Sequence, residues 1–194
     1  MKHNPDEVAN QEKKTLGFWI YLMTDCVLFA ALFATYIVLK NGTAGGETGA
    51  ELFDMPYVLV ETIVLLTSSF TIGMALLAAA RRLKTQTIVW LAITFLLGIT
   101  FLTLEVAEFY ALVAEGNGPS RSGFLSAYFT LVGTHGLHIA VGLLWMIVVI
   151  VRLIQHNFKH TDINRLALLG LFWHFLDIVW IFLFTIVYLI GGMA

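Results

Sequence analysis

Hydrophobic residues occur in five long runs along this chain, and a short polar segment separates each run from the next. A helix needs about 20 apolar residues to cross a hydrocarbon core of about 30 Å. The breaks between the runs are rich in glycine, asparagine, arginine or proline, which favour turns. The pattern therefore predicts an all-α fold, a bundle of five transmembrane helices at residues 17–39, 57–80, 88–113, 124–151 and 166–190.

The composition agrees with a membrane protein. Of the 194 residues 59% are hydrophobic and 12% are charged, whereas a soluble domain carries about 25% charged residues. We expect a cytoplasmic tail at residues 1–16 and one membrane domain at residues 17–194. A net charge of −2 without a basic stripe argues against binding of nucleic acid.

Lysine and arginine predict the orientation of the bundle. Nine of them lie before the first run, after the second or after the fourth, and two lie in the alternate loops. Because cytoplasmic loops carry the excess of positive charge, the N-terminus is expected in the cytoplasm and the C-terminus outside.

Eight ionisable side chains lie inside the apolar runs. A charge at the centre of a membrane costs about 2.5–3.5 kcal/mol on insertion scales. We therefore expect these side chains to face other helices, a partner subunit or a polar cleft, and each is a candidate functional residue. They are Asp25, Glu61, Glu105, Glu108, His135, His138, His174 and Asp177.

His135 and His138 are three residues apart, so both imidazoles can share one helix face. Such a pair could bind a metal or a haem, but intramembrane haem sites usually take histidines from two facing helices. The other interpretation is that both histidines form hydrogen bonds between helices, where Gly133, Gly136 and Gly142 permit close approach. We predict no metal or haem site in this chain.

Two further pairs repeat the three-residue spacing. His174 and Asp177 could act as a proton shuttle or a support for a metal ligand, or could fix the register of two helices. Glu105 and Glu108 suit a proton relay or a cation site. We expect the pairs to form either one interhelical network or two, with His174 and Asp177 bonding to another helix.

Three other residues stand alone in the sequence. Glu61 lies at the outer start of the second run, and Asp25 lies deeper in the first run without a cation in its own helix. Asp25 either packs between helices or contacts a lipid, a proton or a partner. Arg152 ends the fourth run, where a guanidinium can reach the headgroup layer and bind a lipid phosphate or simply anchor the topology.

From the residues alone, a small proton-coupled transporter is an alternative function. Transporters of this kind are built from broken helices and internal repeats around a midplane site. Proline is absent from the middle of every run, and the sequence contains no visible repeat. These observations disfavour the transporter.

From residue 16 onward the chain resembles subunit III of the haem-copper respiratory oxidases. Many cytochrome c oxidase members of this family have seven spans, whereas this chain has five. In this respect, and in the loop at residues 40–46, the chain is similar to the quinol-oxidising branch, the cytochrome o-type ubiquinol oxidases. At Asp25 the mitochondrial-type members hold a glutamate. The resemblance rests on Gly17-Phe18-Trp19-Ile20-Tyr21 before Asp25, Leu104-Glu105-x-x-Glu108-Phe109, Gly133-x-His135-Gly136-Leu137-His138, and Trp173-His174-Phe175-x-Asp177-x-Val179-Trp180.

The resemblance implies a structural subunit without haem, copper or catalytic residues of its own. It implies partners that include oxidase subunits I, II and IV, with haem and copper in the catalytic subunit. It also implies a lipid-filled cleft, an influence on oxygen entry and proton uptake, and a place in the bacterial cytoplasmic membrane. The expected complex reduces oxygen to water with ubiquinol as the donor and pumps protons.

Overall fold

The structure, a computed structural model, describes residues 5–45, 49–52, 54–155 and 160–192. The regular secondary structure of these described residues is entirely helical, without a strand, and five of the helices are long and apolar enough to cross a membrane. The prediction of an all-α bundle of five spans is therefore confirmed. The elements are α1 (Pro5–Leu39), α2 (Gly49–Leu52), α3 (Met55–Ala80), α4 (Lys84–Ala114), α5 (Gly123–Gln155), α6 (His160–Leu183) and the π-helix η1 (Phe184–Ile190).

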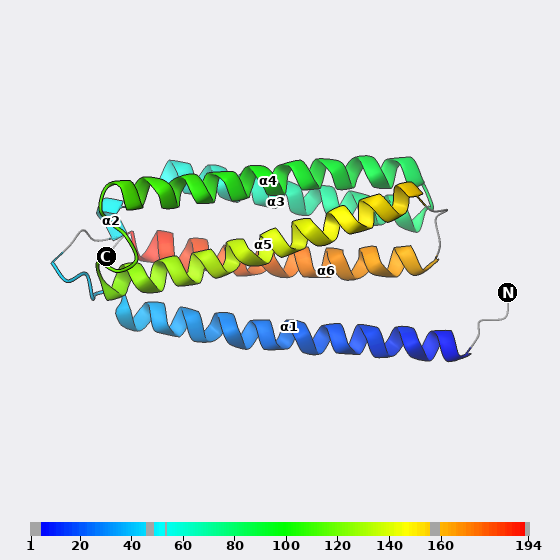
Figure 1. Cartoon of the computed structure of the whole chain (residues 1–194), viewed down its shortest axis with the longest axis horizontal. Helices are drawn as coiled ribbons and strands as arrows, with labels where there is room; N and C mark the ends of the chain where they lie inside the picture. The colour runs from blue at the N-terminus through cyan, green and yellow to red at the C-terminus, as the bar shows by residue number, and fades with distance from the viewer. Residues whose placement is uncertain (1–4, 46–48, 53, 156–159, 193–194) are drawn as a thin grey trace.

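The five long helices run side by side along one axis (Figure 1). Helices α3 and α4 form one side of the bundle, α5 and α6 lie in the middle, and α1 lies on the opposite side (Figure 1). Accordingly, α1 contacts α5 and α6, while α3 contacts α4 and α6. Helix α1 is thus the outlying member of the bundle.

The last span is the centre of the core. In its apolar stretch 56% of the residues are buried, against 22% in that of the first span. Trp173 and Trp180 of α6 are among the largest fully buried side chains, together with Phe101 of α4 and Tyr128 of α5. Trp180 meets Phe101 edge-on, with ring centroids 4.7 Å apart. Large aromatic rings from three helices therefore fill the middle of the bundle.

Two helices end in the same hydrogen-bonded turn. After α3, Arg82 has a φ of 58°, Arg82 N donates to Ala79 O and Leu83 N donates to Ala78 O. After α4, Gly116 has a φ of 84°, and Asn117 N donates to Leu112 O. This left-handed C-terminal turn satisfies carbonyls that the helix leaves open. It lets α4 begin directly after α3, which sets the two helices antiparallel.

Most helices are longer than the apolar runs predict. Helix α1 begins at Pro5 instead of residue 17, α5 continues to Gln155, and α6 begins at His160. Hydropathy locates the part of a helix that suits lipid, but it does not locate the helix ends. Residues 7–14 contain Glu, Gln, Lys and Ala, which are good helix formers and extend the helix into the region expected as a tail.

Two elements were not predicted. The short helix α2 lies in the loop after α1, and η1 replaces the last turns of the fifth span. A π-helix arises where one extra residue enters an α-helix, and such segments are frequent at functional sites. Residues 184–190 are apolar apart from Thr185 and Tyr188, so their composition carries no signal for this change.

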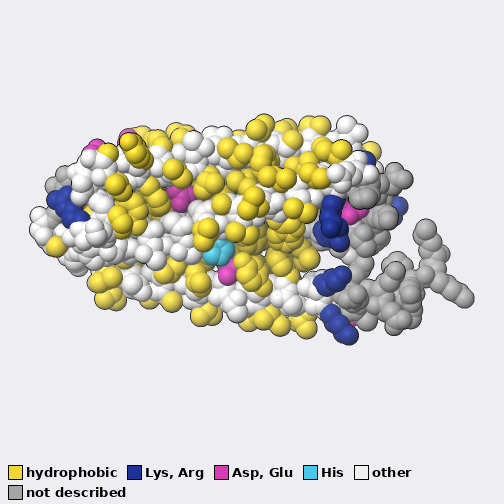
Figure 2. All heavy atoms as spheres, in the orientation of Figure 1, with side chains coloured by type: hydrophobic (Ala, Val, Ile, Leu, Met, Phe, Trp, Pro, Cys, Tyr) yellow, Lys and Arg dark blue, Asp and Glu magenta, His cyan; other side chains and the backbone are white. Residues whose placement is uncertain are grey.

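The surface is apolar along the length of the bundle and charged at its ends. Figure 2 shows a broad field of hydrophobic side chains, with lysine and arginine gathered mainly at the end where α1 begins. Midway along this face, a histidine and an acidic side chain interrupt the apolar surface (Figure 2).

Candidate functional site

Three glutamates from α3 and α4 lie close together inside the bundle, and we call Glu61, Glu105 and Glu108 the acidic cluster. Glu61 is fully buried and Glu105 is 2% exposed. Neither oxygen of Glu61, nor Oε2 of Glu105, has a hydrogen-bond partner among the described residues. The charged neighbours of Glu61 are the other two glutamates. The cluster therefore contains buried acids without a cation partner.

Tyrosine hydroxyls surround this cluster. Tyr188 Oη of η1 donates to Glu108 Oε2 at 3.1 Å. Tyr128 Oη of α5 lies 3.1 Å from Tyr188 Oη, so Tyr128 can donate to Tyr188 in turn. Tyr57 Oη of α3 donates to Leu104 O at 2.9 Å, one residue before Glu105. The π-helical end of the last span thus brings a hydroxyl onto an acid of α4.

Gly136 of α5 makes room for Glu105. A Cβ at residue 136 would lie 2.8 Å from the Glu105 carboxyl carbon, which is too close for van der Waals contact. At Gly133 a Cβ would meet only Phe109, at an ordinary 3.5 Å. A side chain at residue 136 would therefore force Glu105 to move, one at Gly142 would be tight against Phe172 and Trp173 at 3.1 Å, and one at Gly133 would fit.

His135 lies in an aromatic cage. Its ring centroid is 5.3 Å from that of Trp180 and 6.0 Å from that of Phe101, and it is fully buried. Neither ring nitrogen has a hydrogen-bond partner among the described residues. We expected His135 to bond to an acid or another helix, but the structure gives it aromatic neighbours. The spacing of the histidines does not reveal this, because the rings come from three other helices.

His138 faces α1 and not the acidic cluster. His138 Nε2 lies 3.6 Å from Asp25 Oδ2, and Nδ1 lies 2.7 Å from Thr134 O on its own helix. The two side chains are 15% and 9% exposed. We expected His138 to join a network with the other paired residues, but it meets Asp25 instead, because both lie near the middle of their apolar stretches.

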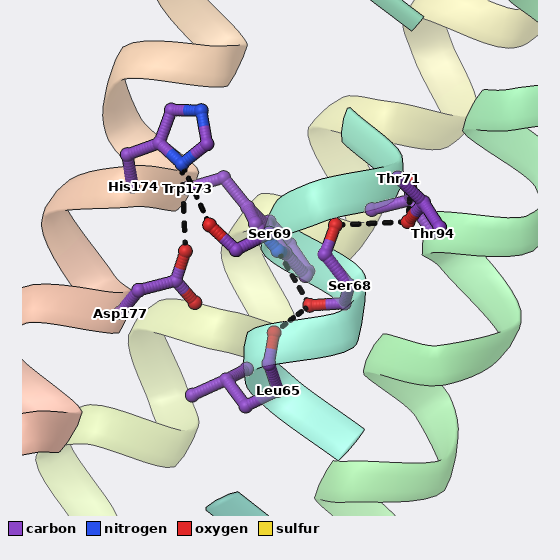
Figure 3. A network of polar contacts seen from close by, with 8 residues as sticks. All are labelled: Leu65, Ser68, Ser69, Thr71, Thr94, Trp173, His174 and Asp177. Atoms are coloured by element: carbon purple, nitrogen blue, oxygen red, sulfur yellow. Dashed lines mark hydrogen bonds and ion pairs between the residues drawn. The ribbon is translucent and has the colours of Figure 1, made fainter. Parts of the chain in front are cut away.

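His174 and Asp177 of α6 face α3, as Figure 3 shows. His174 Nδ1 lies 2.8 Å from Ser69 Oγ and 3.6 Å from Asp177 Oδ2. The pair was expected to bond to another helix, and Ser69 on α3 is that contact. Neither carboxylate oxygen of Asp177 forms a hydrogen bond of standard geometry among the described residues, so its contact with His174 is a longer polar one.

A series of polar contacts between α6, α3 and α4 lies beside the His174–Ser69 contact, and the sequence did not predict it. Trp173 Nε1 donates to Ser68 Oγ at 3.0 Å, and Ser68 Oγ donates to Leu65 O. Thr71 Oγ1 donates to Ser68 O and lies 2.8 Å from Thr94 Oγ1 of α4 (Figure 3). Hydroxyl residues are common in membrane helices, so their sequence positions alone do not predict which ones link helices.

Arg152 lies in the last turn of α5 and is exposed. With Asp162 and Arg165 of α6 it lines a small hollow at the end of the bundle. Arg165 Nη1 lies 3.9 Å from Asp162 Oδ1. Arg152 is therefore placed where its guanidinium can reach a group outside the chain.

Most of the ionisable residues predicted inside the spans thus form three separate groups, instead of the one or two networks that we expected. They are the acidic cluster, the Asp25–His138 pair, and His174 and Asp177 with Ser69. His135 lies apart in its aromatic cage. Within the described residues, no three His, Cys, Asp or Glu side chains are arranged to hold a metal ion.

These features define a class of protein, a multi-pass helical membrane protein with buried ionisable groups. Residues 3–192 match the family model for cytochrome c oxidase subunit III. The chain therefore belongs to the cytochrome c oxidase subunit III family, and the resemblance found in the sequence is confirmed.

Curated bacterial relatives cover nearly the whole chain. It is 54% identical over 98% of its length to the cytochrome bo(3) ubiquinol oxidase subunit 3 of Pseudomonas aeruginosa, of which it covers 92%. It is 45% identical to the cytochrome c oxidase subunit 3 of Bacillus sp. strain PS3, over 96% of this chain and 91% of the relative. It is 44% identical to the quinol oxidase subunit 3 of Bacillus subtilis, over 91% of this chain and 86% of the relative.

The family and the five apolar helices place the chain in the bacterial cytoplasmic membrane. They also remove support for the transporter alternative, because these relatives are oxidase subunits.

Proposed function

We propose that this chain is the third subunit of a terminal oxidase that takes electrons from ubiquinol and reduces oxygen to water. The observation that carries the proposal is the identity of 54% to a ubiquinol oxidase subunit over almost the full length of both chains. Relatives named as cytochrome c oxidase subunits match at 45% and 41% identity. Two relatives named as ubiquinol oxidase subunits stand above both, at 54% and 53% identity, and this favours a quinol as the electron donor of the complex.

In this proposal the chain supports the catalytic subunit and binds no redox cofactor. The surroundings of its histidines support that role. His135 is held by aromatic rings, His138 by Asp25 and Thr134 O, and His174 by Ser69 and Asp177. An intramembrane haem needs histidines that face one another across a gap, whereas these three point to different neighbours. Haem and copper then belong to the partner catalytic subunit.

The Asp25–His138 pair supports a site for a partner on the face between α1 and α5. The side chains of the pair retain 15% and 9% exposure, so a small part of each reaches the surface between α1 and α5. An ionisable pair that faced lipid chains would lose its hydration without compensation. Oxidase subunit I is the expected cover for this face, and subunits II and IV complete the complex.

Phospholipids are the other proposed ligands. A groove of about 670 Å³ lies between the start of α1 and α6, and its apolar walls include Leu16, Trp19 and Leu171. Arg152 lies at the corresponding end of α5, because α1 and α6 begin where α5 ends (Figure 1). A guanidinium is suited to a phosphate because it donates two parallel hydrogen bonds.

The orientation of the bundle is part of the proposal. The positive charges of the loops favour an N-terminus in the cytoplasm and a C-terminus outside, and residues 17–194 then form one membrane domain. The acidic cluster would lie in the outer half and Arg152 at the inner surface.

Purification through an affinity tag on this chain tests the proposal. The tag should recover haem-containing subunits, and the complex should oxidise ubiquinol and consume oxygen. Reduced cytochrome c, supplied at the same electron equivalents, should not be oxidised. Recovery of this chain without any haem protein, or oxidation of cytochrome c in preference to ubiquinol, would contradict it.

A further inference from the structure

The acidic cluster contains buried carboxyl groups without hydrogen-bond partners among the described residues, and a purely supporting subunit does not need such groups. Glu61 is fully buried, and both of its oxygens lack a hydrogen-bond partner among the described residues. Glu105 is 2% exposed and its Oε2 is likewise unpartnered. A buried polar group without a partner costs free energy, and a buried unpaired charge costs far more. These two acids are therefore expected to be kept in the fold for a reason other than packing.

The cluster opens to the end of the bundle at which α3 begins and α4 ends. A pocket of about 390 Å³ lies there, lined by Asp54, Tyr57, Glu108 and Glu115 together with apolar residues of α2 and α4. Glu108 belongs to both the pocket and the cluster. It lies one helical turn from Glu105, so their side chains are neighbours on α4. Glu108 thus connects the pocket to the buried acids.

The pocket attracts cations. Asp54 and Glu115 are exposed at its rim, and Glu115 is the C-cap of α4. The C-terminus of a helix carries a partial negative charge, so an acid at this position adds to that charge instead of balancing it. Acidic walls in a partly enclosed space raise the local concentration of positive ions.

The groups facing the cluster are acids and phenols. His135, which precedes Gly136 on α5, lies against Trp180 and Phe101. A proton neutralises a carboxylate without needing further ligands, and no three His, Cys, Asp or Glu side chains within the described residues are arranged to hold a metal ion. Glu108 of α4, Tyr57 of α3, Tyr128 of α5 and Tyr188 of η1 lie near the two buried acids, and Asp54, the N-cap of α3, lies near Glu108.

We propose that Glu61 and Glu105 hold protons as carboxylic acids and exchange them with water in the pocket through Glu108. A hydronium ion in the pocket gives its proton to the Glu108 carboxylate and leaves as water, and Glu108 passes the proton to an unprotonated Glu61 or Glu105. Tyr188, which donates to Glu108 Oε2, holds the exchanging carboxylate in place. By the expected orientation this site meets the outer aqueous phase.

Infrared spectroscopy of the purified complex in lipid nanodiscs tests the proposal. A protonated carboxylic acid has a C=O stretching band above the amide I region, and an ionised carboxylate lacks this band. The Glu61→Gln and Glu105→Gln variants should each lose the band area of one carboxyl group relative to the unsubstituted complex. Glu12→Gln is the matched control. Glu12 is exposed near the start of α1, at the end of the bundle opposite to the pocket, and its substitution should leave the band unchanged.

Exchange into ²H₂O tests the route to water. The band should shift when the acid proton is replaced by deuterium, and Glu108→Gln should slow that shift at least several-fold. Equal band areas in both glutamine variants and the unsubstituted complex would overturn the proposal. A band that falls in the variants but exchanges at the same rate in Glu108→Gln would overturn the route through Glu108.

A conservative variant keeps the test decisive if glutamine at residue 61 prevents assembly. Glu61→Asp retains an acid but shortens it, so the band should move in frequency and keep its area. An unmoved band in Glu61→Asp would overturn the proposal for Glu61.

Discussion

His138 Nε2 of α5 and Asp25 Oδ2 of α1 face each other at 3.6 Å, and this polar contact joins the outlying helix to the rest of the bundle. Helix α1 otherwise contributes few buried side chains, among them Leu22, Phe29 and Tyr36. Phe29 also packs on the His138 ring, with centroids 5.3 Å apart. The pair therefore has two effects, because it positions α1 and it leaves a polar spot on an apolar face.

Removal of one member of this pair should loosen α1. His138→Leu leaves Asp25 without its partner, and interhelical polar contacts in membranes contribute roughly 0.6–2 kcal/mol. We expect a lower midpoint for thermal loss of this chain from the complex, with near-normal oxygen-reduction turnover in complexes that assemble. The double variant Asp25→Leu with His138→Leu should recover stability, because neither polar group is left alone. A double variant as unstable as the sum of the single variants would contradict the pairing.

Asp177→Leu should weaken retention of the chain for a related reason. Asp177 lies 3.6 Å from His174, which in turn contacts Ser69 of α3, so its removal loosens the contact between α6 and α3. Asp177→Asn keeps the volume and part of the polarity of the side chain. Its retention in the complex should lie between that of the unsubstituted chain and that of Asp177→Leu. Turnover of the assembled complex should stay near normal. Full assembly with complete loss of initial turnover would indicate a direct catalytic role instead.

The sequence predicts the transmembrane spans well, but it does not predict which helices the ionisable side chains contact. Apolar runs locate the five spans because each must match the hydrocarbon core in length. The three-residue spacing of His135 and His138 correctly places both on neighbouring parts of α5. It does not tell which helix each one meets, since this depends on how the helices are rotated and tilted against each other. Hence His138 meets Asp25, whereas His135 enters an aromatic cage.

For the acidic cluster, too, the spacing along one helix does not predict the contacts with other helices. Glu105 and Glu108 could be paired from their spacing, but Glu61 comes from another helix and joins them through the packing of α3 against α4. Tyr128 and Tyr188 have no sequence signal for a role, because tyrosine is ordinary in membrane helices. The contact of Tyr188 depends on the π-helical turn of η1, which the apolar sequence does not predict.

Gly136→Ala should disturb the acidic cluster directly. The new methyl group would collide with the Glu105 carboxyl, and overpacking of this kind costs about 1–3 kcal/mol. We expect lower thermal stability of the complex. Gly133→Ala is the matched control one turn earlier, where a Cβ has an ordinary contact, and it should have little effect. Equal effects of the two variants would contradict the close approach at Gly136.

Arg152→Ala should release a phospholipid. The exposed guanidinium at the end of α5 can bind a lipid phosphate, and alanine cannot. Native mass spectrometry should show one lipid fewer on the complex. Arg121→Ala is the control, because Arg121 is also exposed but precedes α5, at the other end of that helix, and should leave this lipid bound. Unchanged lipid in Arg152→Ala would leave Arg152 as a topology anchor only.

The central claim, that this chain supports a redox centre it does not contain, is tested most directly by haem spectra recorded before and after its removal. The purified complex is stripped of the chain with detergent, and the two fractions are compared. We predict that all of the haem and copper stays with the remaining subunits, and that the isolated chain has no Soret band. A stoichiometric Soret band or bound copper in the isolated chain would contradict the account.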